Sequence, residues 1–192
     1  MVRCPLIAIL DAPDEKPVLA WIRRMIKAPF DLFIIYTGEG IYRLIGFAER
    51  AGLREAFVEA LGKTPKLARG PKPGRALQTL GMKPDINAST PTTEGIIQTL
   101  ESTELDGKRV GIQLYGTDLV EKLMKYLRSR GTEPDCVAPY VYASAAEDAQ
   151  VVALIRQMQT GKVDAIAFTS KTQVKRLRQL ANQQGLEKEL AG

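Results

Sequence analysis

The chain has 192 residues with 45% hydrophobic content, enough for one large or two small globular domains with a buried core. It contains no histidine, which excludes Ser-His-Asp and Cys-His catalysis, histidine general bases and most zinc sites. The net charge of +5 favours anionic partners but is too small to indicate nucleic acid.

Strands and helices are predicted to alternate along nearly the whole chain. Short apolar or β-branched runs indicate strands, and apolar residues spaced at three and four indicate helices. The expected strands or extended segments are 4–10, 31–36, 65–69, 84–89, 108–116, 134–144 and 163–168. The expected helices are 18–28, 41–52, 53–62, 70–81, 90–105, 117–131, 146–161 and 170–185. This alternation predicts an α/β fold with a parallel sheet.

Two stretches of the chain resemble each other. Residues 30–44 read FDLFIIYTGEGIYRL and residues 163–177 read VDAIAFTSKTQVKRL. They align without a gap, and Thr37 falls opposite Ser170. The pattern predicts that a strand, a hydroxyl turn and a helix are built twice.

Small or hydroxyl residues follow the predicted strands or begin the predicted helices. They are Thr37, Gly70, Thr93, Gly116 and Ser170. In open α/β sheets, ligands bind beyond the carboxyl ends of the strands. Helix capping explains any one such turn, whereas five on one edge indicate a pocket for a ligand with several carboxylates or phosphates.

The stretch ARGPKPG (68–74) is the most distinctive of these turns. Arg69 and Lys72 flank Gly70 between a predicted strand and a predicted helix. One interpretation is a cationic turn that faces the ligand edge, and the other is an ordinary turn with exposed charges. The stretch is not a phosphate-binding P-loop, and the chain has no dinucleotide fingerprint after its first strand.

Phenols are the better candidates for a proton donor in a chain without histidine. Tyr140 and Tyr142 lie in the extended segment 134–144, where alternation places both on one face. Either they are core residues or one of them serves a cleft. Cys4 and Cys136 are too far apart in sequence for a redox or metal pair, so both are interpreted as buried thiols.

The ordered motifs resemble those of the uroporphyrinogen-III synthase family. They are FD-x₄-T-[GS] before a helix, RGPK with A-L-x₃-G, T-x-EG-[IL], VGIQLYG, a segment ending in VY, and VDAIAFTS-x₃-V. The resemblance runs from about residue 4 to about 185. It implies two similar parallel-sheet α/β domains joined by two extended crossing segments, CPLIAIL and CVAPYVYAS. Residues 11–138 would form a complete domain, and residues 1–10 with 139–192 would form the crossings and part of a second.

The resemblance also implies an activity. The family is a lyase of porphyrin and haem biosynthesis that closes linear hydroxymethylbilane into uroporphyrinogen III, inverting ring D with loss of water. It needs no metal or organic cofactor. By motif, Tyr142 matches the tyrosine that assists departure of the hydroxyl. The predicted substrate-binding residues, from the motifs and the cationic turn together, are Thr37, Gly38, Arg69, Gly70, Lys72, Thr93, Gly116 and Ser170.

Two departures from the family pattern support an alternative function. Tyr36 stands where the family usually has threonine, and the second domain has fewer residues than the roughly 100 of an ordinary domain. The alternative is a non-catalytic domain that binds a tetrapyrrole or another polycarboxylate, or a regulatory domain. A two-lobed binding protein for small anions ranks last because the start of the chain lacks the form of a secretory signal.

The family resemblance and the apolar pattern also predict the partners and the location of the protein. We expect a small-molecule substrate and neither nucleic acid nor membrane as a partner. No apolar run approaches the roughly 20 residues that span a bilayer, so the expected location is the cytoplasm. A dimer would complete the second lobe in trans.

Overall fold

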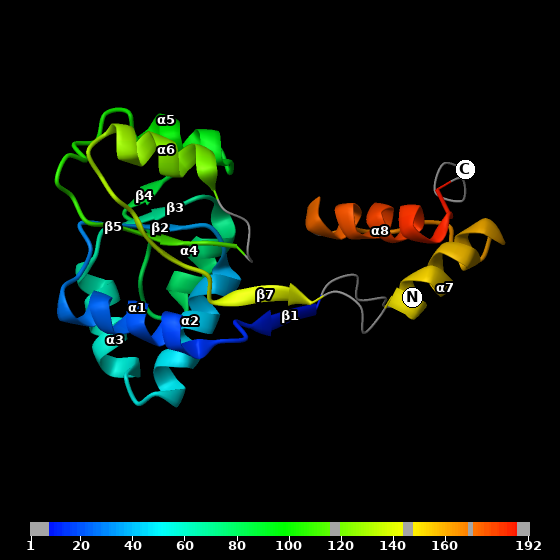
Figure 1. Cartoon of the computed structure of the whole chain (residues 1–192), viewed down its shortest axis with the longest axis horizontal. Helices are drawn as coiled ribbons and strands as arrows, with labels where there is room; N and C mark the ends of the chain where they lie inside the picture. Colours follow the sequence, from blue (N-terminus) through cyan, green and yellow to red (C-terminus); the bar gives the residue numbers. More distant parts are fainter. Residues whose placement is uncertain (1–7, 116–119, 144–147, 169–170, 188–192) are drawn as a thin grey trace. The chain divides into compact units, whose positions relative to one another are not determined.

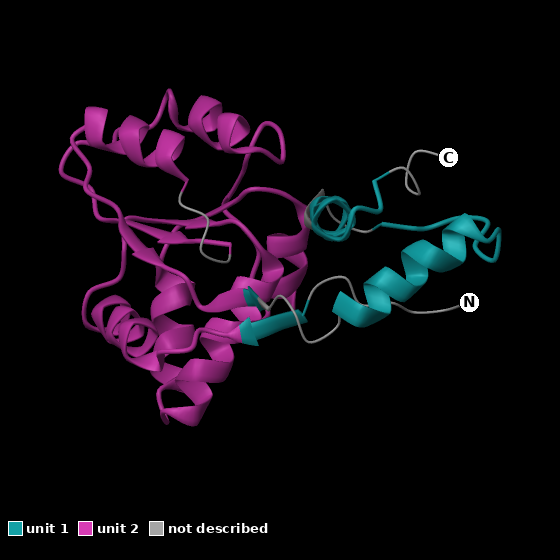
Figure 2. Cartoon of the chain, turned by 45° about the vertical axis from the view of Figure 1, so that its right-hand side comes forward, with its two compact units in different colours: residues 1–10, 142–192 teal, residues 11–141 magenta. Residues whose placement is uncertain are grey.

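A computed structural model describes residues 8–115, 120–143, 148–168 and 171–187 (Figure 1). The chain divides into two compact units, residues 11–141 and residues 1–10 with 142–192 (Figure 2). Within the described ranges, no helix is long and apolar enough to cross a membrane.

The larger unit is built on a five-stranded parallel sheet in the order β4-β3-β2-β5-β6. The strands are β2 (Leu32–Ile35), β3 (Lys66–Ala68), β4 (Ile86–Asn87), β5 (Val110–Gln113) and β6 (Asp135–Val137). The helices are α1 (Glu15–Lys27), α2 (Gly38–Arg50), α3 (Arg54–Lys63), α4 (Pro71–Gln78), α5 (Thr93–Leu100) and α6 (Glu121–Ser129). The parallel α/β fold predicted from the sequence is therefore confirmed.

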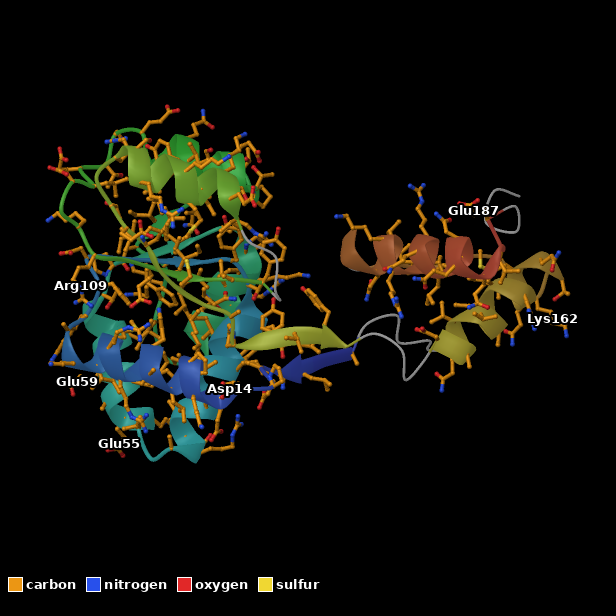
Figure 3. The ribbon with its side chains drawn as sticks, in the orientation of Figure 1. Asp14, Glu55, Glu59, Arg109, Lys162 and Glu187 are labelled. Atoms are coloured by element: carbon orange, nitrogen blue, oxygen red, sulfur yellow. The ribbon has the colours of Figure 1, made fainter. Side chains whose placement is uncertain are left out.

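Helices cover both faces of this sheet because β2 is apolar on both sides. Phe33 and Ile35 pack against α1 to α4, whereas Leu32 and Ile34 pack against α5 and α6. Figure 1 shows α1 to α3 on one side of the sheet and α5 and α6 on the other. Such continuous apolar strands are typical of parallel sheets buried on both faces. A side chain caps α1, since Asp14 accepts a 3.0 Å hydrogen bond from the Lys16 amide at the start of that helix (Figure 3).

The strand order creates one switch point in the sheet. After β2 the chain moves outward through β3 and β4, then returns to place β5 on the other side of β2. Helices α2 to α4 lie on one face and α5 and α6 on the other, so the crossovers leave β2 and β5 in opposite directions. A crevice at the carboxyl ends of such strands is the usual ligand position in doubly wound sheets.

A separate two-stranded sheet pairs the segments through which the chain enters and leaves the larger unit. It consists of β1 (Ala8–Asp11) and β7 (Tyr140–Ala143), whose arrows run in opposite directions in Figure 1. Beside it, the Ala12 amide donates a 3.1 Å hydrogen bond to the Pro139 carbonyl. The pairing joins the two segments predicted as crossings.

The predicted extended segment 134–144 proves to be two strands in different sheets. β6 is the edge strand beside β5, and β7 pairs with β1. Pro139 lies between them. Proline has no amide hydrogen to donate to a ladder, so it favours the break between two strands.

The smaller unit contains α7 (Asp148–Gln159) and α8 (Lys171–Gln184). The two helices share an apolar cluster and are joined by an ion pair between Arg176 and Asp148. The predicted strand 163–168 is wrong, since no strand forms there and Phe168 is exposed. A strand needs a pairing partner, and β1 and β7, the other strand segments described in this unit, pair with each other.

A buried lysine secures the start of β3. The Lys66 ammonium donates hydrogen bonds to the Thr64 carbonyl at 2.6 Å and the Leu61 carbonyl at 3.4 Å, and it lies 3.1 Å from Asp85 Oδ2. The same carboxylate accepts a 2.8 Å hydrogen bond from the Lys66 amide. Partial burial would raise the pKa of Asp85, but its hydrogen bonds and the charge of Lys66 outweigh burial and lower the pKa.

Replacing Asp85 with asparagine should flatten the acid dependence of stability. A carboxyl with a lowered folded pKa stabilises the fold above its unfolded pKa of about 3.9, and that contribution is lost as pH falls through the folded pKa. At pH 7 we expect Asp85→Asn to cost about 1 kcal/mol because solvent screens a half-exposed carboxylate, and the difference should vanish in strong acid. Urea denaturation followed by the single tryptophan, buried Trp21, measures it.

The matched control for Asp85 is Glu133→Gln. Its exposed pair with Arg128 also lowers the pKa of Glu133, but neither partner is buried, so only a small change is expected. Stability curves for Asp85→Asn that run parallel to the parent at every pH would show that the Lys66 pair contributes nothing.

Candidate functional site

The carboxyl ends of β2 and β5 bring Thr37 and Gln113 together at the switch point. Thr37 caps α2, since its hydroxyl accepts a 3.0 Å hydrogen bond from the Gly40 amide. The Thr37 amide donates to Gln113 Oε1 at 3.0 Å, and the Thr37 hydroxyl lies 3.4 Å from the same oxygen. The amide and the hydroxyl of Thr37 are therefore both engaged within the protein.

Gln113 is fully buried, and its carboxamide is satisfied on both sides. Its oxygen accepts from Thr37, and its nitrogen donates to the Leu114 carbonyl. The space for this side chain exists because residue 40 is glycine, since a Cβ there would overlap the Gln113 carboxamide. Gly40 and Gln113 thus form a matched pair that holds the start of α2 on the end of β5.

Tyr140 joins the same cluster from the beginning of β7. Its hydroxyl lies 3.1 Å from Thr37 Oγ1, and the residue is buried. Because the Thr37 hydroxyl has one proton, donation to Gln113 leaves Tyr140 as the donor. Tyr142 follows two residues later in the same strand and is half-buried. The hydrogen bond therefore fixes the start of the strand that carries Tyr142.

A second pair of hydroxyls lies on the β3 side of β2. The Tyr36 hydroxyl is 3.3 Å from Thr93 Oγ1. Burial raises the pKa of Tyr36 to about 12, so the phenol stays protonated at neutral pH. Thr92 is the cap of α5, accepting a 3.0 Å hydrogen bond from the Gly95 amide, and Thr93 is the first helical residue.

Arg69 lies against two tyrosine rings at this edge. Its guanidinium carbon is 5.1 Å from the centre of the Tyr36 ring and 5.3 Å from that of Tyr115. The two rings are stacked with centres 5.4 Å apart. Backbone pairing places the arginine, since the Arg69 amide donates a 3.0 Å hydrogen bond to the Ile35 carbonyl.

The turn after Arg69 begins α4. Gly70 is its cap, without a side-chain hydrogen bond, and Pro71 occupies the first turn. Lys72 is exposed there. The Lys72 carbonyl also packs on α2, where a Cβ at Gly38 would lie only 2.7 Å from it. Gly38 is buried and serves the contact between α2 and α4.

The structure brings several predicted site residues to one edge of the sheet. Two of them lie just after strands β2 and β3, namely Thr37 and Arg69. The others lie at the starts of α2, α4 and α5, namely Gly38, Gly70, Lys72 and Thr93. Gly116 and Ser170 lie outside the described residues. The substrate-binding role of each residue stays a prediction.

Three residues of the site are not among the site residues predicted from the sequence. Gln113 and Tyr115 were not singled out, and Tyr36 was noted only as a departure from the family pattern. Gln113 did carry a signal, because it is a polar residue at the end of a fully apolar strand, VGIQ. Tyr115 carried none, since its role depends on Arg69 from another strand.

The donor groups at this edge of the sheet suit an anion. The described residues contain no group of three or more Cys, Asp or Glu residues that could hold a metal ion. The donors at the sheet edge are phenols, amides and the Arg69 guanidinium. These groups suit carboxylates or phosphates.

An open hollow of about 330 Å³ lies elsewhere, between Asp11 and residues of α2. There Arg43 pairs with Asp11 at 2.8 Å and with Glu39 at 2.6 Å, and Arg50 reaches Asp11 at 2.7 Å. Two carboxylates balance the two cations. These ion pairs connect the end of β1 to α2. The hollow lacks the unbalanced positive charge that an anion site needs.

The sequence of the chain matches a family model and a curated relative. The family described as uroporphyrinogen-III synthase HemD matches residues 1–192. The chain is 33% identical over 171 residues to the uncharacterised protein YjjA of Bacillus subtilis, covering 89% of this chain and 63% of that protein. The chain thus spans less than two thirds of the length of this curated relative.

Solved structures agree with the family match. A crystal structure of a mutant uroporphyrinogen III synthase from the extremely thermophilic bacterium Thermus thermophilus superposes with a TM-score of 0.71 at 26% identity, covering 98% of this chain and 71% of that one. The wild-type enzyme in another crystal form gives 0.60 at 28% identity, covering 98% and 70%. The chain belongs to the uroporphyrinogen-III synthase family.

Proposed function

We propose that this chain converts hydroxymethylbilane to uroporphyrinogen III, with inversion of ring D and loss of water. The observation that supports this most is the hydrogen bond between Tyr140 and Thr37. It ties the strand that bears Tyr142 to the switch point, where doubly wound sheets bind their ligands. The family match and the similarity to Thermus enzymes of this name point to the same reaction.

Tyr142 is proposed to act as the proton donor. A hydroxyl group departs as water if a nearby acid protonates it while the pyrrole electrons break the carbon–oxygen bond. The resulting azafulvenium ion is reactive, so the remaining task is to present the correct carbon of ring D. Binding the substrate carboxylates at the sheet edge would supply that positioning.

A second candidate function is binding of a tetrapyrrole or another polycarboxylate without turnover. One observation favours it: the amide and hydroxyl of Thr37 are already used by Gln113, Gly40 and Tyr140. They would reach a substrate only if this cluster opened. Tyr36 also fills the position where the family usually has a smaller hydroxyl residue.

Product analysis separates the two candidates. Hydroxymethylbilane closes without a catalyst to the type I isomer, so the enzyme should raise the fraction of type III in proportion to its concentration. The isomers are separated chromatographically after oxidation to porphyrins. If only the type I isomer forms at every protein concentration, the proposed catalytic function is wrong. Saturable binding of a porphyrin polycarboxylate, measured by calorimetry, would then support the second candidate.

A further inference from the structure

Four arginines of the larger unit lie over aromatic rings, and one of them differs from the rest. These arginines are Arg50, Arg69, Arg109 and Arg130. Arg50 pairs with Asp11, Arg109 donates to the Ala28 carbonyl at 2.8 Å, and Arg130 donates to the Thr103 carbonyl at 2.9 Å. Across the described ranges, the Arg69 guanidinium has neither a hydrogen-bond acceptor nor an ion-pair partner.

The tyrosine platform orients this cation. Contact with Tyr36 and Tyr115 restrains the guanidinium, and the residue is only partly buried. A planar guanidinium can donate two parallel hydrogen bonds to one carboxylate. Because the platform orders the arginine in advance, less conformational entropy is lost on binding than for a free side chain.

The charges around Arg69 leave it unbalanced. The charge of Glu94, at the start of α5, also acts on the pKa of Tyr36, but Glu94 is paired with Lys122 at 2.9 Å. Lys72 adds a second exposed cation three residues further along the chain. The local field therefore favours an anion.

We propose that Arg69, seated on Tyr36 and Tyr115, binds one carboxylate of the ligand. The proposal rests on the proposed function for the ligand class, a tetrapyrrole with acidic side chains. It also gives Tyr36 a role, because the ring that replaces the usual family threonine provides half of the platform. Arg69 is thus a specificity-determining residue that selects a carboxylate over an uncharged group.

Binding can be tested without turnover by using succinate as the probe. In protein labelled with ¹⁵N arginine, the Arg69 Nε–H signal should shift saturably with succinate at constant ionic strength, and succinamide should have no effect. The signal of Arg109, which Figure 3 labels, is an internal control, since its guanidinium already donates to the Ala28 carbonyl. Equal shifts with succinate and succinamide, or no saturation, would overturn the proposal.

Three variants test the platform in the same titration. Arg69→Lys keeps the positive charge but loses the planar guanidinium with its two parallel N–H donors, so it should bind succinate more weakly. Tyr36→Thr removes one ring of the platform and should also weaken binding. Tyr36→Phe keeps the ring and loses only the hydrogen bond to Thr93, so it should bind as the parent does. If Tyr36→Thr binds as tightly as Tyr36→Phe, the platform has no part in recognition.

In the isomer assay, Arg69→Gln should raise KM about 10- to 100-fold, the usual effect of losing a charge-assisted hydrogen bond, with kcat changed less than about 3-fold. The two proposals fail in different ways. Succinate binding without type III product would leave the Arg69 site intact and end the proposed function. Type III product with an unchanged KM in Arg69→Gln would support the proposed function and overturn the Arg69 site.

Discussion

Gly40→Ala is expected to lower the free energy of unfolding by about 2 kcal/mol, even though alanine is the better helix former. The added methyl group would occupy the space of the Gln113 carboxamide, which is fully buried. Gln113 would have to leave the Thr37 amide, and the Tyr140 hydroxyl would lose its ordered acceptor. The change therefore acts on the cap of α2 and on the strand that carries Tyr142.

Gly46→Ala is the matched control for Gly40→Ala in the same helix. A Cβ at residue 46 meets only the tip of Arg50, at 3.4 Å, and that side chain is flexible. The substitution should stabilise the fold by about 0.5–1 kcal/mol through helix propensity alone. Urea denaturation read by Trp21 compares both variants with the parent. Equal stability of the two variants would show that Gln113 does not depend on the glycine.

The sequence predicted the parts of the site that local signals determine. The run DLFIIY indicated a buried strand, and the threonine and glycines after it indicated a turn before a helix over 41–52, whereas α2 already begins at Gly38. The structure has β2, a Thr37 cap and α2 in that order. Each of these features depends on residues within one turn of one another, so periodicity and capping chemistry sufficed.

Features that depend on a distant partner were missed or wrongly predicted. The run VDAIAF has strand composition but forms no strand, because pairing rather than composition stabilises a strand. Gln113 reaches Thr37, and Arg69 reaches Tyr36 and Tyr115, from different strands of the sheet. Only the strand order β3-β2-β5 brings these residues together, and the sequence alone did not specify that order.

Tyr142→Phe is expected to lower kcat for formation of the type III isomer about 100-fold, the lower end of what a positioned general acid contributes. The substitution removes one hydroxyl and keeps the ring. Residual type III product would come from substrate positioning, which the variant preserves. Single-turnover kinetics with isomer analysis give the rate of the chemical step apart from product release.

Tyr140→Phe is the control because Tyr140 lies two residues earlier in the same strand. Its hydroxyl contacts Thr37 rather than a proposed reacting group, so its loss should lower stability while kcat falls less than about 10-fold. If Tyr142→Phe retains full kcat, the leaving hydroxyl takes its proton from another donor. If both variants lose kcat equally, the strand acts as one positioning unit, and the assignment of Tyr142 as the acid is wrong.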